Sequence, residues 1–472
     1  MAHVNPLPPL SRREMLGRMG AGFGSLGLAG VMADAGALAP SAASAAELAA
    51  KAPHFAPKAK YVIQLFMPGG PSQVDTFDYK PEIKKQEGQR PQIVNKKSLR
   101  NTKNGLFASP FGFKQYGECG KWVSDIFPHV GECVDDLCFI HSMHTDIPEH
   151  AGAILMMTLG HLQPSRPSMG SWLVYGLGSE NENLPGFVAM SPRAQPRGKL
   201  ANWGNAFLPG AYAGTYVNIA DMKPDRILRD LKNQWLPREQ QRKQADLLTK
   251  LNRLDLKQQQ TDQQLEAGIQ AMEMAFRMQF AVPEAFDTSQ ETKATLEMYG
   301  DGEYAKGCLL ARRLIERGIR SVQLSHSIDG YDIAWDTGHN DIVGGHTRLA
   351  KACDQGIAAL IKDLKQRGLF EETLLVWGGE FGRAPTSEGK KGHDHYGYTV
   401  WLAGGGVKGS ISYGATDQFG LSAVENRVHV HDLHATILHL MGLDHEKLTY
   451  RYSGRDYRLT DMHGEVVREI IA

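Results

Sequence analysis

Short apolar segments that end in glycine-rich turns alternate along this 472-residue chain with long helix-like segments. The clearest apolar segments are residues 61–67 (YVIQLFM), which lead into 68–71 (PGGP), and residues 374–377 (LLVW), which lead into 378–379 (GG). Continuous apolar runs of this length are typical of strands that are buried on both faces of a sheet. Because strands that alternate with helices usually pair in parallel, the pattern predicts an α/β fold with a mainly parallel central sheet sandwiched by helices.

The remaining elements continue this alternation. Further strands are expected at residues 137–140, 321–324 and 399–403, and helices at about 147–159, 307–319, 342–367 and 431–441. Residues 181–217 are rich in Gly, Pro and Asn, which predicts an irregular region over the sheet. We find no internal repeat and no interdomain linker. Residues 46–472 are therefore expected to form a single domain with a polar helical insertion at about 239–280.

The N-terminal segment has the features of an export signal. Residues 11–16 (SRREML) contain two consecutive arginines, and a weakly apolar Gly/Ala stretch follows to about residue 32. Residues 43–45 (ASA) offer an A-x-A cleavage site, so we interpret residues 1–45 as a twin-arginine signal peptide. The alternative is an N-terminal helix that stays on the protein. Export by this route predicts a periplasmic or cell-envelope location and suits a protein that takes up a metal before export.

The composition excludes several classes of partner. Lys and Arg together number 52, as do Asp and Glu, which leaves no net field to attract nucleic acid or an anionic membrane. No internal apolar run is long enough to span a bilayer, so we expect no integral membrane span in the mature chain. Five scattered cysteines do not make a disulfide scaffold, although one disulfide among Cys119, Cys133 and Cys138 is compatible with the periplasm.

The loop at residues 380–395 (EFGRAPTSEGKKGHDH) follows the predicted strand at 374–377. In open α/β sheets, ligands bind at the carboxyl ends of the strands. The loop carries four side chains of metal-ligand types, namely Glu380, His393, Asp394 and His395. Arg383 in the same loop is suited to a bidentate contact with an oxyanion. A solvated loop closed by an Arg–carboxylate pair would explain any one of these residues, but a functional site explains the whole cluster better.

Two further loops at predicted strand ends also carry metal-ligand types. Residues 69–78 contain Asp75, which can coordinate a cation or cap a helix after a tight turn. Residues 325–346 contain Asp336 and His339, which can hold a divalent metal or lie in a polar surface loop.

A fourth polar group precedes the predicted helix at 147–159 and includes Glu149 and His150. Helix capping and core histidines are the alternative explanation for this group. Four such groups at strand ends have a metal-assisted hydrolytic site as their simplest common cause. A serine hydrolase is disfavoured because the sequence has no G-x-S-x-G elbow.

Together these segments resemble a bacterial family of unassigned activity, domain-of-unknown-function family 1501. The matching pieces are the twin-arginine start and residues 66–78, 144–150, 167–172, 311–318, 335–340, 378–385, 392–395, 431–438 and 453–460. The family is similar to a distant branch of the alkaline phosphatase and sulfatase superfamily. The resemblance implies an α/β sandwich with its site at the carboxyl ends of the strands.

The resemblance also implies roles for single residues. In the superfamily an Asp and a His on one loop and a later His hold one metal, and Asp336, His339 and His395 occupy these places. For a second metal, Glu380 stands where the acid of an Asp-His pair would be, but Phe381 replaces the histidine and cannot bind a metal.

A helix-start nucleophile is also replaced, because Glu149-His150-Ala151-Gly152 contains no Ser, Thr or Cys. What remains is a single-metal site that uses water as nucleophile. In this interpretation Arg383 holds the anionic group and His150 or Glu149 acts as general base.

We therefore expect an exported metal-dependent hydrolase that acts on a phosphate or sulfate ester, with polysaccharide esters among its candidate substrates. Its cofactor would be a divalent metal ion: zinc, calcium, magnesium or manganese. The alternative is a non-catalytic relative that binds an anionic glycan or an envelope partner through the same cleft.

Overall fold

The computed structural model describes residues 48–91, 105–181, 183–220, 284–339, 341–386 and 391–472. The predicted signal peptide at 1–45 and the predicted helical insertion at 239–280 lie outside the described residues.

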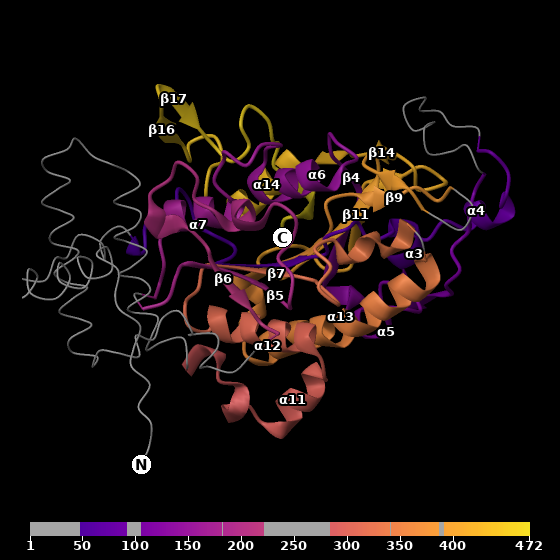
Figure 1. The fold of residues 1–472 in the computed structure, drawn as a ribbon, viewed down its shortest axis with the longest axis horizontal. Coiled ribbons are helices and arrows are strands. Elements are labelled where there is room, and N and C mark those ends of the chain that lie inside the picture. The colour runs from indigo at the N-terminus through magenta and orange to yellow at the C-terminus, as the bar shows by residue number, and fades with distance from the viewer. Residues whose placement is uncertain (1–47, 92–104, 182, 221–283, 340, 387–390) are drawn as a thin grey trace, which may run out of the picture.

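A nine-stranded sheet forms the centre of the described chain (Figure 1). Its strands are β1 (Tyr61–Phe66), β4 (Leu137–His144), β5 (Phe187–Ser191), β6 (Thr215–Asn218), β7 (Ser321–Ser325), β8 (Thr373–Gly378), β11 (Tyr398–Ala403), β12 (Ile411–Tyr413) and β15 (Val428–His429). They lie in the order β12-β4-β11-β8-β1-β7-β5-β6, and β15 also pairs with β4. Neighbouring strands are parallel except where β11 pairs with β4 and β8. The prediction of an α/β fold with a mainly parallel sheet is confirmed.

Helices cover both faces of this sheet (Figure 1). One face carries α6 (His150–Leu159), α7 (Met169–Leu177) and α14 (Val430–Leu440), and the other carries α5 (Pro128–Gly131), α11 (Lys293–Tyr299), α12 (Glu303–Ile315) and α13 (Ile342–Gln366). Alternate side chains of β1 enter the two apolar cores. Ile63 and Leu65 belong to the core that includes α12 and α13, whereas Val62 and Phe66 belong to the core that includes α6 and α14. Burial on both faces explains why this strand is apolar throughout.

The central strands end at the same level, which brings their following turns together. Phe66 at the end of β1 pairs with Ser325 of β7 on one side and with Gly378 of β8 on the other. β4 runs in the same direction, because β11 is antiparallel to both β4 and β8. The loops that follow β1, β4, β7 and β8 therefore meet at one edge of the sheet, where α/β proteins bind ligands.

Two expectations about the chain differ from the structure. Residues 181–217 are not wholly irregular, because they contain β5 and β6 at the edge of the main sheet. All five cysteines are free thiols, so the disulfide considered among Cys119, Cys133 and Cys138 does not form.

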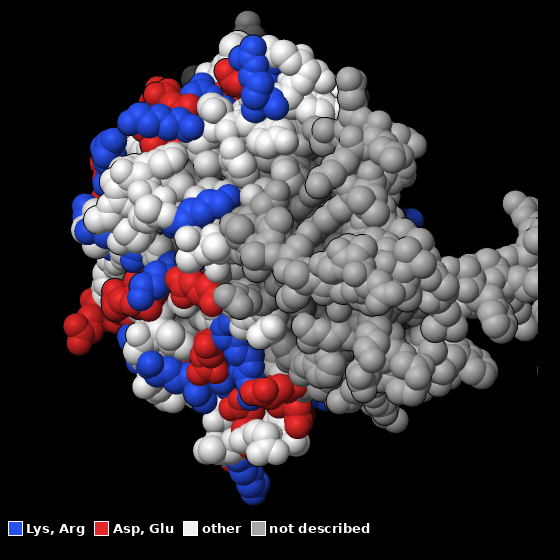
Figure 2. Space-filling view, turned by 90° about the vertical axis from the view of Figure 1, so that its left-hand side faces the viewer, with Lys and Arg blue, Asp and Glu red and all other residues white. Residues whose placement is uncertain are grey.

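Two features of the exterior concern partners. None of the described helices is both long enough and apolar enough to cross a bilayer. On the face shown in Figure 2, the described basic and acidic side chains are interspersed with one another.

Candidate functional site

The turn after β1 holds the loop that follows β7. Gly69 has a φ of +109°, and a Cβ at this position would lie 2.3 Å from the backbone nitrogen of Asp336 and 2.6 Å from that of Trp335. Trp335 in turn donates its backbone N–H to the carbonyl of Pro68 at 2.9 Å. Only glycine allows such a close approach at this backbone conformation. The PGGP turn therefore fixes the position of Asp336.

The start of α6 supplies a buried histidine. Glu149 is the N-cap of this helix, and its carboxylate accepts hydrogen bonds from the backbone N–H groups of Ala151 and Gly152, both at 2.9 Å. Burial alone would raise the pKa of Glu149, but these hydrogen bonds lower it. A lower pKa weakens the general base expected here. The cap also places His150, the first helical residue, against the loops that follow β7 and β8, where it contacts Asp336 and Glu380.

Three side chains from separate loops converge beside this helix start. Nε2 of His150 lies 3.2 Å from Oδ1 of Asp336, and Nε2 of His393 lies 3.4 Å from the same oxygen. The three ligand atoms lie within 4.8 Å of one another, as in no other His, Cys, Asp or Glu trio among the described residues. The His150 side chain is 6% exposed, whereas those of Asp336 and His393 are each 29% exposed. We call these three residues the His–Asp–His cluster, and it is open to solvent on the side of Asp336 and His393.

The opposite nitrogens of the two imidazoles have hydrogen-bond partners of their own. Nδ1 of His150 donates to Oε1 of Glu380 at 2.5 Å, and Nδ1 of His393 donates to the carbonyl of Pro148 at 2.8 Å. A proton held on Nδ1 leaves the Nε2 lone pair of a neutral imidazole free to bind a metal. Both rings therefore present Nε2 to the same Asp336 oxygen, which is the arrangement expected of metal-binding histidines.

Glu380 supports His150 from behind the cluster. Its fully buried carboxylate accepts the backbone N–H of Gly69 through both oxygens, at 3.0 and 3.1 Å. Burial alone would lower the pKa of His150, but its contacts with Asp336 and Glu380 raise that pKa to about 9. The sequence predicts Glu380 to be a metal ligand. The structure places it on the far nitrogen of His150, where it orients the ring.

Arg383 supports Asp336. Its guanidinium lies 2.6 Å from Oδ1 of Asp336 and donates to the carbonyls of Gly69, Gly70 and Lys391. The arginine is fully buried, so these N–H groups face protein atoms. Burial alone would raise the pKa of Asp336, but contacts with His150, His393 and Arg383 hold it well below its usual range. The structure thus places Arg383 away from the expected contact with a substrate anion.

Asp75, a further predicted metal ligand, takes part in a buried ion pair. Its carboxylate lies 2.7 and 2.9 Å from Nζ of Lys391, and neither side chain has any exposed surface. Asp75 also accepts a hydrogen bond from the hydroxyl of Ser72. Both carboxylate oxygens are therefore engaged away from the His–Asp–His cluster.

The short antiparallel pair β9 (Gly382–Arg383) and β10 (His393–Asp394) decides which residues of the 380–395 loop reach the cluster. Neighbouring residues of a strand point to opposite sides. His393 enters the cluster, whereas Asp394 is fully buried, and burial raises its pKa well above the usual value. The ring of His395 packs against Tyr396 and lies outside the cluster.

Two predicted metal ligands remain to be placed, His395 and His339. His393 lies in the cluster and His395 does not, and the G-H-D-H segment contains both imidazoles without showing the strand register that separates them. The side chain of His339 lies outside the described residues.

Phe381 forms an apolar wall of the cluster. Its ring centroid lies 4.8 Å from that of His150 and 4.9 Å from that of His393, and the residue is 1% exposed. An apolar wall excludes water from one side and strengthens the electrostatic interactions of the charged groups beside it.

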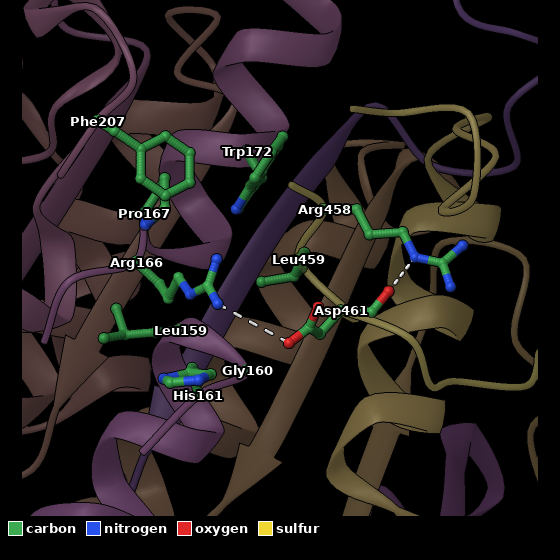
Figure 3. A pocket seen from close by; sticks show the side chains of 10 residues that line it. All are labelled: Leu159, Gly160, His161, Arg166, Pro167, Trp172, Phe207, Arg458, Leu459 and Asp461. Atoms are coloured by element: carbon green, nitrogen blue, oxygen red, sulfur yellow. Dashed lines mark hydrogen bonds and ion pairs between the residues drawn. The ribbon is translucent and has the colours of Figure 1, made fainter. Parts of the chain in front are cut away.

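Another hollow, between the end of α6, α7 and the C-terminal segment, is too narrow to admit a water molecule (Figure 3). Arg166 lies 3.8 Å from the carboxylate of Asp461, and Arg458 donates to the Asp461 carbonyl. We do not consider it a ligand site.

Comparison with known proteins places the chain in a family. The family model "Protein of unknown function (DUF1501)" matches residues 59–471, and the chain belongs to this family, as its motifs predicted. A comparison with curated proteins finds no significant match.

Among solved structures, the chain is similar to the lipoteichoic acid synthase LtaP from Listeria monocytogenes, with a TM-score of 0.35 and 9% identity over 88% of this chain and 78% of that chain. It is also similar to the PsFucS1 sulfatase from Pseudoalteromonas sp., with a TM-score of 0.36 and 10% identity over 82% of this chain and 68% of that chain. A third similar structure is alkaline phosphatase from the Antarctic bacterium TAB5, with a TM-score of 0.32 and 11% identity over 83% of this chain and 99% of that chain. At these TM-scores neither residue roles nor an activity can be transferred.

Proposed function

We propose that this member of the DUF1501 family is an exported metal-dependent hydrolase of phosphate or sulfate esters, including those of polysaccharides. The observation that carries the proposal is the His–Asp–His cluster, in which three ligand atoms converge at the carboxyl edge of the sheet. The two consecutive arginines at residues 12 and 13 support export.

The residues present fit a divalent metal. Nε2 of His150 is buried, and although Asp336 lies 3.2 Å away, the contact does not have hydrogen-bond geometry. Two imidazole nitrogens and one carboxylate oxygen are a common ligand set for zinc and other transition ions, and a partly exposed site leaves room for further ligands. A metal bound by His150, Asp336 and His393 would polarise an ester oxygen and lower the pKa of a water molecule.

The chain itself prepares this site in three ways. Glu380 fixes the orientation of His150, and the carbonyl of Pro148 does the same for His393. Arg383 holds Asp336 in place and balances its charge. The open side of the cluster gives an ester access to it, while the closed side is fixed by hydrogen bonds, as a preorganised site requires.

Elemental analysis of the folded, purified protein tests the metal, and His393→Ala and His395→Ala provide a matched pair. Both variants remove one imidazole from the same loop, but only His393 lies in the cluster. We expect stoichiometric divalent metal in the parent and in His395→Ala. In His393→Ala the affinity should fall by more than the 10–100-fold that loss of a supporting partner costs. Absence of metal from the parent, or equal metal in the two variants, contradicts the proposal.

Substrate and location need separate measurements. Metal-loaded protein should hydrolyse members of a panel of phospho- and sulfo-esters, and His393→Ala should be inactive on the same members. Turnover of none of them by metal-loaded protein would favour the non-catalytic relative that only binds an anionic glycan or an envelope partner. Replacement of both arginines at residues 12 and 13 by lysine should retain the protein in the cytoplasmic fraction.

A further inference from the structure

A cavity of about 610 Å³ lies beside α14 and is lined by Asp146, His429, His431, Asp432, Glu446 and His463, among others. This volume is within the range of about 300–1,000 Å³ that is typical of small-molecule sites. We call it the α14 cavity. It lies at the same edge of the sheet as the His–Asp–His cluster, because His429 of β15 pairs with His144 at the carboxyl end of β4.

The loop between β4 and α6 connects the α14 cavity with the cluster. Asp146 in this loop faces the cavity, where its Oδ2 lies 3.3 Å from Nε2 of His429. Two residues further on, the Pro148 carbonyl accepts the hydrogen bond that orients His393. A ligand that spans this loop could therefore contact both places.

The cavity offers a donor and an acceptor side by side. Nδ1 of His429 accepts the backbone N–H of His431 at 3.2 Å, so in the neutral ring the proton is on Nε2. This Nε2–H makes no hydrogen bond of proper geometry, although the Asp146 carboxylate is near. A hydroxyl group both accepts and donates, so one ligand hydroxyl can satisfy the imidazole N–H and the carboxylate together.

The remaining lining suits a neutral, polyhydroxylated ligand. His431 is 5% exposed, burial lowers its pKa to about 3, and its Nδ1 is without a hydrogen-bond partner. Glu446 and Glu465 add acceptors, while Arg458 lies 3.6 Å from Glu446. The N-terminus of α14 does not attract an anion, because the Asp432 carboxylate already lies there and accepts the backbone N–H of His429. The acidic surplus would repel a second phosphate or sulfate group.

We propose that the α14 cavity binds the sugar part of the ester, while the charged phosphate or sulfate group is directed to the His–Asp–His cluster. The placement of the charged group at the cluster rests on the proposed function. The proposal of a sugar site at Asp146 and His429 stands on the α14 cavity alone.

Asp146→Ala and His463→Ala test the site, because both side chains are exposed and neither belongs to the cluster. Matched controls are Asp301→Ala, in the exposed turn before α12, and His129→Ala in α5, on the other face of the sheet. The probes are glucose 6-phosphate and galactose 6-sulfate, compared with p-nitrophenyl phosphate and sulfate, which lack the polyol. Binding is measured by calorimetry and turnover by KM and kcat, all with metal-loaded protein.

We expect Asp146→Ala to weaken binding of a sugar ester at least tenfold, as the loss of a hydrogen bond to a charged group does. Its KM for the sugar ester should rise about tenfold more than its KM for the p-nitrophenyl ester, and the controls should behave as the parent. Sugar-ester binding that Asp146→Ala weakens, without any turnover, supports the sugar site and refutes the hydrolase.

Three outcomes would overturn the sugar site. Turnover of p-nitrophenyl esters by a parent that binds neither sugar ester overturns the sugar site and leaves the hydrolase standing. The sugar site is also refuted if both variants change the two ester classes equally, or if the parent binds none of the probes.

Discussion

The pKa of His150 makes the stability of the metal-free protein depend on pH in a specific window. Its value of about 9 in the folded protein exceeds the value of about 6.5 for a free histidine. A raised pKa contributes stability that is complete below pH 6.5 and is lost as the pH rises through about 9. At about 1.4 kcal/mol for each pH unit, the difference corresponds to about 3 kcal/mol in the free energy of unfolding. The residue is 5% exposed, so solvent screening reduces this figure little.

Urea unfolding in excess chelator, at intervals between pH 6.5 and 9.5, measures this contribution. Glu380→Gln is the informative variant, because Glu380 supplies both a hydrogen bond and a negative charge to His150. We expect the free energy of unfolding of the parent to fall with pH more steeply than that of Glu380→Gln, by part of the about 3 kcal/mol, because Asp336 still raises the pKa of His150 in the variant. Glu297→Gln on the exposed α11 controls for the loss of a carboxylate and should follow the parent. Parallel curves for the parent and Glu380→Gln would refute the reasoning.

Two further substitutions test how the cluster is held. Gly69→Ala should lower both the melting temperature and the metal affinity, because the added Cβ must push away the backbone of Asp336. Gly330 is also at positive φ but has open space around it, so Gly330→Ala should cost only the backbone strain of about 1–3 kcal/mol. Equal shifts of the melting temperature in the two variants would contradict this account. Arg383→Met should destabilise the protein by at least about 1–3 kcal/mol in urea unfolding, because it leaves the buried carbonyls of Gly69 and Gly70 without their donor and Asp336 without its guanidinium partner. A loss below about 1 kcal/mol would show that Arg383 is dispensable for the fold.

The fold was largely predictable because its central strands are apolar on both faces. The runs at 61–67, 321–324 and 374–377 became β1, β7 and β8 with ends shifted by one residue at most. Such strands can be recognised in a sequence because their side chains pack into apolar cores on both faces of the sheet and are therefore almost all apolar. β5 and β6 were missed because they lie among turns rich in Gly and Pro, which predict irregular structure. The antiparallel direction of β11 was also hidden, because strand direction depends on the connections and not on local composition.

The site was predictable at the level of loops but not of single side chains. The loops that carry His150, Asp336 and His393 were all identified, because ligand-type residues at strand ends share one edge of the sheet. Whether a carboxylate faces the cluster or a buried cation depends on contacts between distant parts of the chain. Asp75 meets Lys391, which is 316 positions away, and no spacing rule gives that pairing. The choice between His393 and His395 depends on the register of a two-residue strand.

The balance of charge at the cluster connects metal binding with the class of substrate. Without a metal and below pH 9, two carboxylates (Asp336 and Glu380) are balanced by the Arg383 guanidinium and the His150 imidazolium. A metal can bind Nε2 of His150 only when that imidazole has lost its proton. Metal binding therefore replaces the single positive charge of the His150 imidazolium by the two positive charges of the metal ion. Together with Arg383, Asp336 and Glu380, the site then has a single net positive charge. In a partly buried site with the Phe381 ring on one side, that charge is screened less than in water and attracts an ester anion. The metal-free protein lacks this attraction, so anion binding should depend on the metal in a hydrolase and in a purely binding relative alike. Only turnover of the bound ester distinguishes the two.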